Sequence, residues 1–183
     1  MPLSKYAVGT RYGRALFDLA EEHQITAEVN LQLIALREII NSDPRLLTML
    51  TDKNVSCEQK KQLLKTLQQP FLIFIQNLLQ MIYDYGHIAD LLAIITDYQQ
   101  RYDKANNRIH ATVITAVPMS SVQEQAMQQA LIKRFNAKEV ILKQQIDKQI
   151  IGGVVVRVKD MIIDGSLATR ITNLKNYLSK SFN

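Results

Sequence analysis

The first hundred residues repeat apolar side chains at a helical period. Apolar positions recur three or four residues apart, which places them on one face of a helix. The repeating positions are Val8, Tyr12, Ala15, Leu16 and Leu19 in a first segment, Val29, Leu33, Leu36 and Ile40 in a second, and Ile88, Leu91, Leu92, Ile95, Tyr98 and Tyr102 in the last. Residues 71–85 are apolar on nearly every side, which is typical of a helix buried inside a bundle. Short connections force neighbouring helices to pack antiparallel, so we expect a six-helix bundle over residues 1–104.

Local signals predict where several of these helices begin and end. Pro44 suits the first position of a helix, where the N–H that it lacks would have no partner. Ser56 and Gln59 have the spacing of a capping box, in which each side chain accepts a hydrogen bond from the other residue's backbone N–H. Gly86 is expected to end the apolar helix. These signals divide the segment into helices of ordinary length.

The period changes from helical to alternating near residue 105. Residues 109–117 and 140–146 alternate in the manner of strands. Between them, Ser120 or Ser121 can cap a helix whose inner face is expected to be Val122, Ala126, Met127, Ala130, Leu131 and Phe135. The final helix carries one apolar stripe, which is Leu167, Ile171, Leu174 and Leu178. We therefore expect residues 105–183 to form a small α+β domain, with a sheet backed by two helices.

The segment over residues 150–174 predicts a strand, a tight turn, a second strand, an Asp-Gly-Ser turn and a helix. Its two adjacent glycines lack the pattern of a phosphate-binding loop, so they indicate a bulge or a close approach of two backbones. One aspartate is assigned to the hairpin turn, and a second to the turn before the final helix, where its carboxylate can cap backbone N–H groups. The predicted structural motif is Gly152, Gly153, Asp160, Asp164, Gly165 and Ser166.

Charge is divided unevenly along the chain. Residues 1–100 have a net charge of −2 and residues 101–183 a net charge of +7, which favours an acidic partner for the second domain, although chance gives the same asymmetry. The lone cysteine, Cys57, favours a reducing compartment. The sequence starts without the apolar region of a signal peptide, and its longest apolar run is too short and too polar to span a membrane. We expect a soluble protein.

Catalytic, metal-binding and cofactor-binding patterns are missing from the sequence. The three histidines, His23, His87 and His110, fall in separate predicted elements without the spacing of metal ligands. We therefore expect no catalytic site, no metal and no cofactor. A basic RNA- or ribosome-binding module is the alternative function for the second domain, but no aromatic residue lies in its predicted strands, where bases would stack.

Three segments resemble one known family. Residues 11–20, Arg-Tyr-Gly-Arg-Ala-Leu-Phe-Asp-Leu-Ala, look like the opening helix of the delta subunit of bacterial F-type ATP synthase, whose mitochondrial counterpart is the oligomycin-sensitivity-conferring protein. Residues 151–166 are similar to the signature near the C-terminus of that family, and residues 111–118 to the strand that opens its second domain. Lys159 stands where the family usually has a glycine, and His87 where it tends to have an arginine.

The resemblance implies a role as a non-catalytic subunit of the peripheral stalk, or stator, of the rotary proton-translocating ATP synthase. In the family, the N-terminal bundle binds the N-terminal helix of an alpha subunit of the catalytic head. The C-terminal domain meets the C-terminal end of the b-subunit stalk. The resemblance also implies resistance to rotor torque, no cofactor, no nucleic acid, and a peripheral location at the cytoplasmic face of the cell membrane through the complex.

The resemblance further implies that the alpha-subunit helix lies in a groove between the first and fifth helices. The candidate groove residues are Ala7, Arg11, Tyr12 and Ala15, opposite Gln76, Leu79 and Tyr83. Periodicity alone equally allows Tyr12, Ala15 and Leu79 to be core residues, because the floor of a groove and a core have the same spacing.

Overall fold

The computed structural model describes residues 5–181 of the chain. The chain divides into two compact units, of which the first ends at Lys104 and the second begins at Ala105. This division falls where the sequence changes from a helical to an alternating period. Among the described residues, no helix has both the length and the apolar character needed to cross a membrane.

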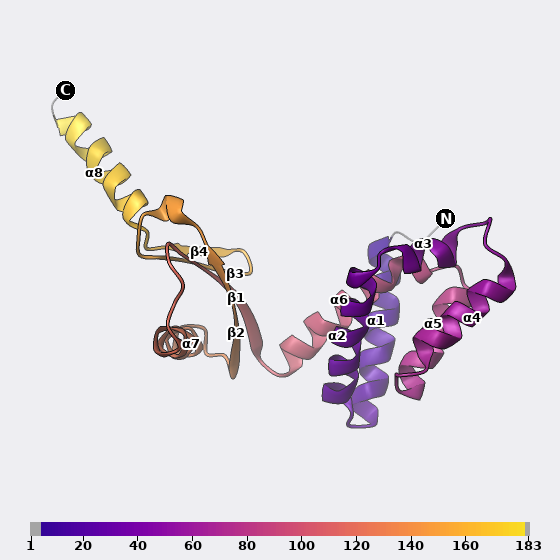
Figure 1. Ribbon diagram of the computed structural model, residues 1–183. Coiled ribbons are helices and arrows are strands. Elements are labelled where there is room, and N and C mark those ends of the chain that lie inside the picture. Colours follow the sequence, from indigo (N-terminus) through magenta and orange to yellow (C-terminus); the bar gives the residue numbers. More distant parts are fainter. Residues whose placement is uncertain (1–4, 182–183) are drawn as a thin grey trace. The chain divides into compact units, whose positions relative to one another are not determined.

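The first unit is entirely helical, as expected (Figure 1). Its elements are α1 (Lys5–Glu22), α2 (Thr26–Ser42), α3 (Arg45–Thr51), α4 (Cys57–Gln68), α5 (Ile73–Asp84), the short 3-10 helix η1 (Ile88–Asp90) and α6 (Leu91–Ala105). The capping box is confirmed: the Gln59 N–H donates to the Ser56 hydroxyl at 3.3 Å, and the Ser56 N–H donates to the Gln59 side chain at 3.3 Å. Pro44 directly precedes α3, and Gly86 follows α5 with a φ of +73°.

The core of the first unit is built from the predicted apolar stripes. Val8, Leu33, Ile75 and Ile95 are fully buried, and each such side chain contributes about 1.5–3 kcal/mol by leaving water. Tyr98 is also fully buried, and its hydroxyl donates to a backbone carbonyl oxygen on α2 at 2.9 Å. Burial raises the pKa of the Tyr98 phenol well above its ordinary value. The stripes therefore define one core shared by the helices.

Helix α1 lies close against α6 because two glycines face it. A Cβ on Gly13 would stand 2.7 Å from a carboxylate oxygen of Asp97 and 3.0 Å from the Ile94 carbonyl oxygen. A Cβ on Gly9 would stand 3.1 Å from the backbone of Ala93. The two backbones can approach this far only where α1 lacks side chains.

The expectation that the apolar helix lies buried inside the bundle holds for only one of its faces. Helix α5 begins at Ile73, two residues later than expected, and its buried positions form one face. Ile73 is 57% exposed and Met81 is 42% exposed. These exposed apolar side chains leave a surface on α5 that the chain's own packing does not cover.

The second unit is a four-stranded mixed sheet with helices. Its elements are β1 (Arg108–Thr115), α7 (Ser121–Phe135), β2 (Glu139–Ile146), the short 3-10 helix η2 (Lys148–Ile150), β3 (Val154–Val158), β4 (Met161–Asp164) and α8 (Leu167–Ser181). The strand order is β2-β1-β3-β4, with β1 parallel to β2 and the other pairs antiparallel. Helix α7 makes the crossover that a parallel pair requires. The expected fold class, a helical bundle followed by a small α+β domain, is confirmed.

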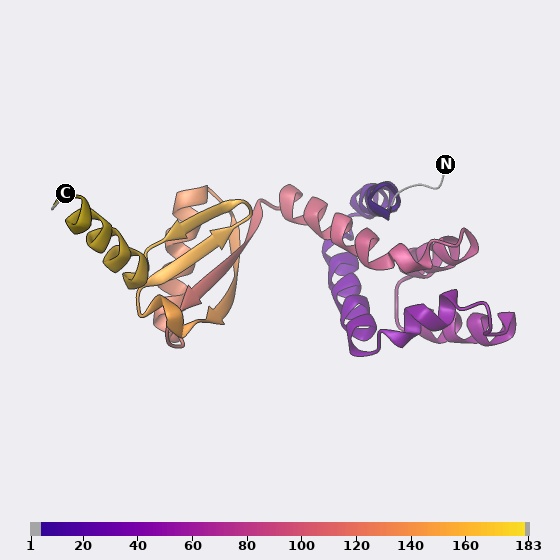
Figure 2. The ribbon, with the colours of Figure 1, turned by 90° about the horizontal axis from the view of Figure 1, so that it is seen from above.

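The two helices of this unit differ in how they pack. Helix α7 contacts β2 and buries Leu131 in the core, and Figure 1 and Figure 2 show α8 leading away from the sheet. The predicted inner face of α7 is only partly correct, since Val122 is 74% exposed. The apolar stripe of α8 is not buried either: Ile171 is 54% and Leu174 is 62% exposed, and the side chain of Leu178 lies outside the described residues. Helix α8 packs mainly against η2.

Candidate functional site

An open groove of about 310 Å³ lies between α1 and α5. Its lining residues are Arg11, Tyr12, Ala15, Leu16 and Leu19 from α1, and Phe74, Asn77, Leu78 and Met81 from α5. Leu16 and Leu78 are buried and form the floor, whereas Met81 is partly exposed at the rim. The lining is mostly apolar, so the groove can receive the apolar stripe of a partner helix.

The ring of Tyr12, which lines this groove, is contacted by Arg11 and by His87. The Arg11 guanidinium lies over the Tyr12 ring, 5.9 Å from its centroid, which is within cation–π range. The His87 ring lies 6.1 Å from the Tyr12 ring, centroid to centroid. The His87 Nδ1 is 3.5 Å from a carboxylate oxygen of Asp90. His87 therefore contacts Tyr12 from the bend after α5, where the resemblance leads one to expect an arginine.

A second aromatic side chain of the groove also meets a histidine. The rings of Phe74 and His23 are in edge contact, with centroids 4.9 Å apart. His110 lies on β1, in the other unit. Within the described residues, no group of three or more His, Cys, Asp or Glu side chains is arranged to hold a metal ion.

The second unit has its own apolar depression, of about 460 Å³, beside α7. Its lining residues are Thr115, Ala116, Val117, Pro118, Met119, Gln123, Ala126, Met127, Ala130, Gly152, Gly153 and Val154. A Cβ on Gly152 would meet the Leu167 side chain at 3.0 Å, so this depression adjoins the first residue of α8. Leu167 in turn begins the exposed apolar stripe of α8. We call the depression and this stripe together the apolar track.

The glycines of the predicted motif allow two backbone segments to meet. Gly153 has a φ of +79°, and a Cβ there would collide with the carbonyl oxygen of Gly165. The Leu167 N–H donates to the Gly152 carbonyl oxygen, and the Gly165 N–H to the Val154 carbonyl oxygen, each at 2.9 Å. The segment before β3 is thereby joined to the turn before α8.

Asp164 and Ser166 cap the start of α8. The Asp164 carboxylate accepts the Ser166 N–H and the Thr169 hydroxyl, each at 2.8 Å. These hydrogen bonds lower the pKa of Asp164 below its ordinary value, and the bond from the Ser166 backbone N–H has the largest effect. The Ser166 hydroxyl accepts the Thr169 N–H at 3.2 Å. The Asp-Gly-Ser segment thus has the capping geometry that its sequence suggested.

The hairpin turn between β3 and β4 is formed by Lys159 and Asp160. Lys159 has a φ of +50°, in the left-handed region that costs an L-residue about 1–2 kcal/mol. The turn therefore uses the conformation for which a glycine is suited, although a lysine occupies it.

Comparison with known proteins decides what kind of chain this is. The sequence profile of the family described as "ATP synthase delta (OSCP) subunit" matches residues 8–178. The chain belongs to this family. The resemblance inferred from the sequence is confirmed, and the comparisons give no support to the RNA-binding alternative. The chain is thus a component of the peripheral stalk of an ATP synthase, an enzyme complex.

Individual relatives agree with this assignment over nearly the full chain. The chain is 38% identical to the ATP synthase subunit delta of Limosilactobacillus reuteri, with 97% of this chain and 99% of the relative covered. It is 35% identical to that of Lactiplantibacillus plantarum, with 97% and 98% covered. A chain of the Toxoplasma gondii mitochondrial ATP synthase hexamer matches with a TM-score of 0.71 and 20% identity over 93% of this chain and 96% of that chain, which shows a shared fold.

The structure brings together three of the seven groove residues proposed from the delta-family resemblance. Arg11, Tyr12 and Ala15 line the groove. Leu79 is fully buried in the core, and the Gln76 amide donates to the Phe71 carbonyl oxygen at 2.7 Å. The remaining two, Ala7 and Tyr83, are half-buried and are not among the lining residues.

The three residues that the sequence interpretation proposed on α5 lie outside the lining of this groove. Gln76 is hydrogen-bonded to the α4 side of the helix, since its carbonyl oxygen accepts the Gln68 amide at 2.9 Å. The groove is on the other edge, at Phe74, Leu78 and Met81. Both sets of positions obey helical spacing, so periodicity could not separate them. The lining residues that the sequence interpretation did not name are Leu16, Leu19, Phe74, Asn77, Leu78 and Met81.

Proposed function

We propose that this chain is the adaptor of a stator, held at one unit by the catalytic head and at the other by the stalk. The first unit binds the N-terminal helix of an alpha subunit in the groove between α1 and α5. The second unit binds the C-terminal end of the b-subunit stalk. In this proposal the chain is a peripheral protein of the cell membrane, held at the cytoplasmic face through the complex.

The groove is the observation that carries the proposal. Two helices that are buried on one face leave apolar side chains on an adjoining face, and these line an open depression. An amphipathic helix binds such a depression by inserting side chains spaced three or four residues apart. Leu19, Phe74 and Met81 would leave water when the partner helix is bound.

A stator needs slow dissociation, because the rotor applies torque to the head while the stalk holds it. Nanomolar binding corresponds to about −12 kcal/mol. An interface of standard size, about 1,600 Å² in total, supports affinities from micromolar to picomolar. One helix in the groove, together with contacts at the second unit, gives the adaptor two independent attachments.

The apolar track of the second unit supports the proposed contact with the stalk. A helix of 15 residues that exposes its apolar stripe is marginally stable alone, and a partner helix that covers Ile171 and Leu174 would stabilise it. The net charge of +7 over residues 101–183 favours an acidic partner and speeds its association.

A groove-filling substitution tests the proposed head contact. Ala15 is an exposed residue on the groove wall, and glutamine there would obstruct the partner helix without disturbing the core. We expect Ala15→Gln to weaken binding of a peptide of the alpha-subunit N-terminal helix about tenfold or more, measured by isothermal titration calorimetry. Ala35→Gln on α2, also an exposed helical alanine, is the matched control. Equal binding by both variants would refute the proposed site.

A further inference from the structure

Arg11 is the one charged side chain among the described residues that line the groove. Its helical neighbours at the spacings where an ion pair could form carry no carboxylate. These neighbours are Ala7, Val8, Arg14 and Ala15. The α5 residues across the groove carry none either, and they are Phe74, Asn77, Leu78 and Met81. The groove therefore presents a cation without a counterion of its own.

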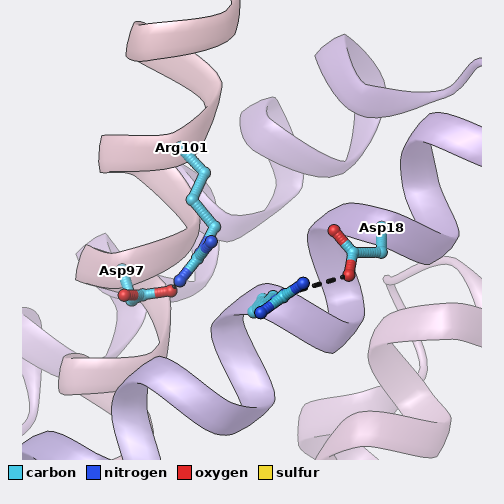
Figure 3. Close-up of polar contacts among 4 residues, drawn as sticks. Asp18, Asp97 and Arg101 are labelled. Carbon is cyan, nitrogen blue, oxygen red and sulfur yellow. Dashed lines mark hydrogen bonds and ion pairs between the residues drawn. The ribbon is translucent and has the colours of Figure 1, made fainter.

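Two carboxylates of the first unit are already engaged with arginines other than Arg11. On α1, Asp18 pairs with Arg14 at 3.4 Å, and on α6, Asp97 pairs with Arg101 at 2.6 Å. Figure 3 shows Asp97 and Arg101 together on one helix and Asp18 with its own ion pair on another. Within the part of the chain that the structure describes, no carboxylate oxygen lies within ion-pair distance of Arg11.

The Tyr12 ring holds this cation at the rim of the groove. A guanidinium that lies over an aromatic ring keeps the N–H groups at its edge available to an acceptor. A carboxylate can accept two of these N–H groups at once, which fixes its position as well as neutralising the charge. A partner helix that covered Arg11 without supplying an acceptor would desolvate an unpaired charge.

We propose that Arg11 binds a single carboxylate on the helix that occupies the groove, and that this contact sets the register of that helix. An apolar stripe repeats every three or four residues, so a helix shifted by one turn still presents apolar side chains to Leu16 and Leu78. One charged contact distinguishes the correct register from the shifted one. This inference rests on the proposed function of the groove and adds the chemistry by which it selects its partner.

Binding of Arg11 variants to the alpha-subunit N-terminal peptide tests the contact. We expect Arg11→Gln to weaken binding about fivefold and Arg11→Glu about tenfold or more, since the latter repels the carboxylate. Arg14→Gln is the matched control, because Arg14 lies on the same helix and pairs with Asp18 outside the groove. We expect this control to bind within about twofold of the unmodified chain. Thermal unfolding of each variant verifies that the exposed substitutions leave the fold intact.

Charge exchange on the peptide tests the register. Each Asp and Glu of the peptide is replaced in turn by Lys, and we expect one of these peptides to regain binding to Arg11→Glu while losing it to the unmodified chain. If the unmodified chain fails to bind the original peptide, the proposed function of the groove is wrong. If that peptide binds but Arg11→Glu binds it equally well, or if none or several of the lysine peptides restore binding, the function stands and the Arg11 inference is overturned.

Discussion

Replacing Gly153 by alanine should destabilise the second unit through two separable effects. The φ of +79° costs an L-residue about 1–2 kcal/mol. The new Cβ would also collide with the Gly165 carbonyl oxygen, which is backbone and cannot rotate away. A shift of packed backbone of this kind costs about 1–3 kcal/mol, so we expect a total loss of about 3 kcal/mol in the free energy of unfolding.

Gly86→Ala is a matched control for the cost of placing an L-residue at a positive φ. Gly86 has a similar φ of +73°, but a Cβ there would meet nothing within 4 Å. Its cost should be confined to the conformational penalty of about 1–2 kcal/mol. The excess loss in Gly153→Ala therefore measures the collision with the turn before α8.

Hydrogen exchange followed by mass spectrometry is the appropriate assay, because the two units need separate measurements. We expect Gly153→Ala to lower protection in peptides from β3 and β4 and to leave the first unit unchanged, and Gly86→Ala to act on peptides from α5 alone. Gly153→Asp would add an unpaired charge at the same position and should impair assembly more strongly than alanine. Equal losses of protection for Gly153→Ala and Gly86→Ala would refute the proposed collision.

Three further outcomes are expected. Lys159→Gly should raise the free energy of unfolding by about 1 kcal/mol, because glycine relieves the positive φ of the hairpin turn; an unchanged or lower melting temperature would contradict this. The pKa of Asp164 is lowered in the folded chain, so the stabilisation by its carboxylate is complete above the unfolded-state pKa of about 3.9 and is lost as pH falls through the lower folded pKa. The melting temperatures of the unmodified chain and of Asp164→Asn should therefore converge at acid pH. A difference in melting temperature that stayed constant from pH 7 to strongly acid pH would contradict this expectation. Ile171→Asp should weaken binding to the soluble part of the b subunit more than Asn173→Asp does, because Asn173 is exposed but lies off the apolar stripe. Equal affinities of the two variants in a binding titration would exclude α8 from the contact with the b subunit.

The sequence predicted those parts of the fold that short-range chemistry determines. The capping box at Ser56 formed as its spacing indicated, because it depends on a serine and a glutamine three residues apart. The sequence left the cap of α7 open between Ser120 and Ser121, and the structure assigns it to Ser120. The change of period near residue 105 likewise separated a helical segment from an alternating one, because a hydrophobic period is a short-range property of the sequence. Periods of 3.6 and 2 arise from backbone geometry and need no knowledge of distant contacts.

The parts that escaped prediction depend on which neighbours cover a given helix face. In α5, Leu79 and Leu78 are adjacent leucines on an apolar helix, and only the packing of α4 and α1 decides which edge borders the groove. The stripe of α8 was identified correctly as a stripe, yet its direction away from the sheet follows from the turn at Asp164 and the contact with η2. A hydrophobic pattern shows which face of a helix is apolar, but it does not show which neighbouring element or partner packs against that face.

The glycines of α1 have a consequence on another side of the helix. One side of α1 rests on α6 at Gly9 and Gly13, and another side forms a wall of the groove at Tyr12 and Ala15. Any side chain added at Gly13 would displace that wall and alter the width of the depression, even though Gly13 itself never touches an occupant. Residues that do not touch the occupant thus set the width of the groove. A related chain that kept every lining residue but lost the close spacing of α1 and α6 would have a groove of a different width.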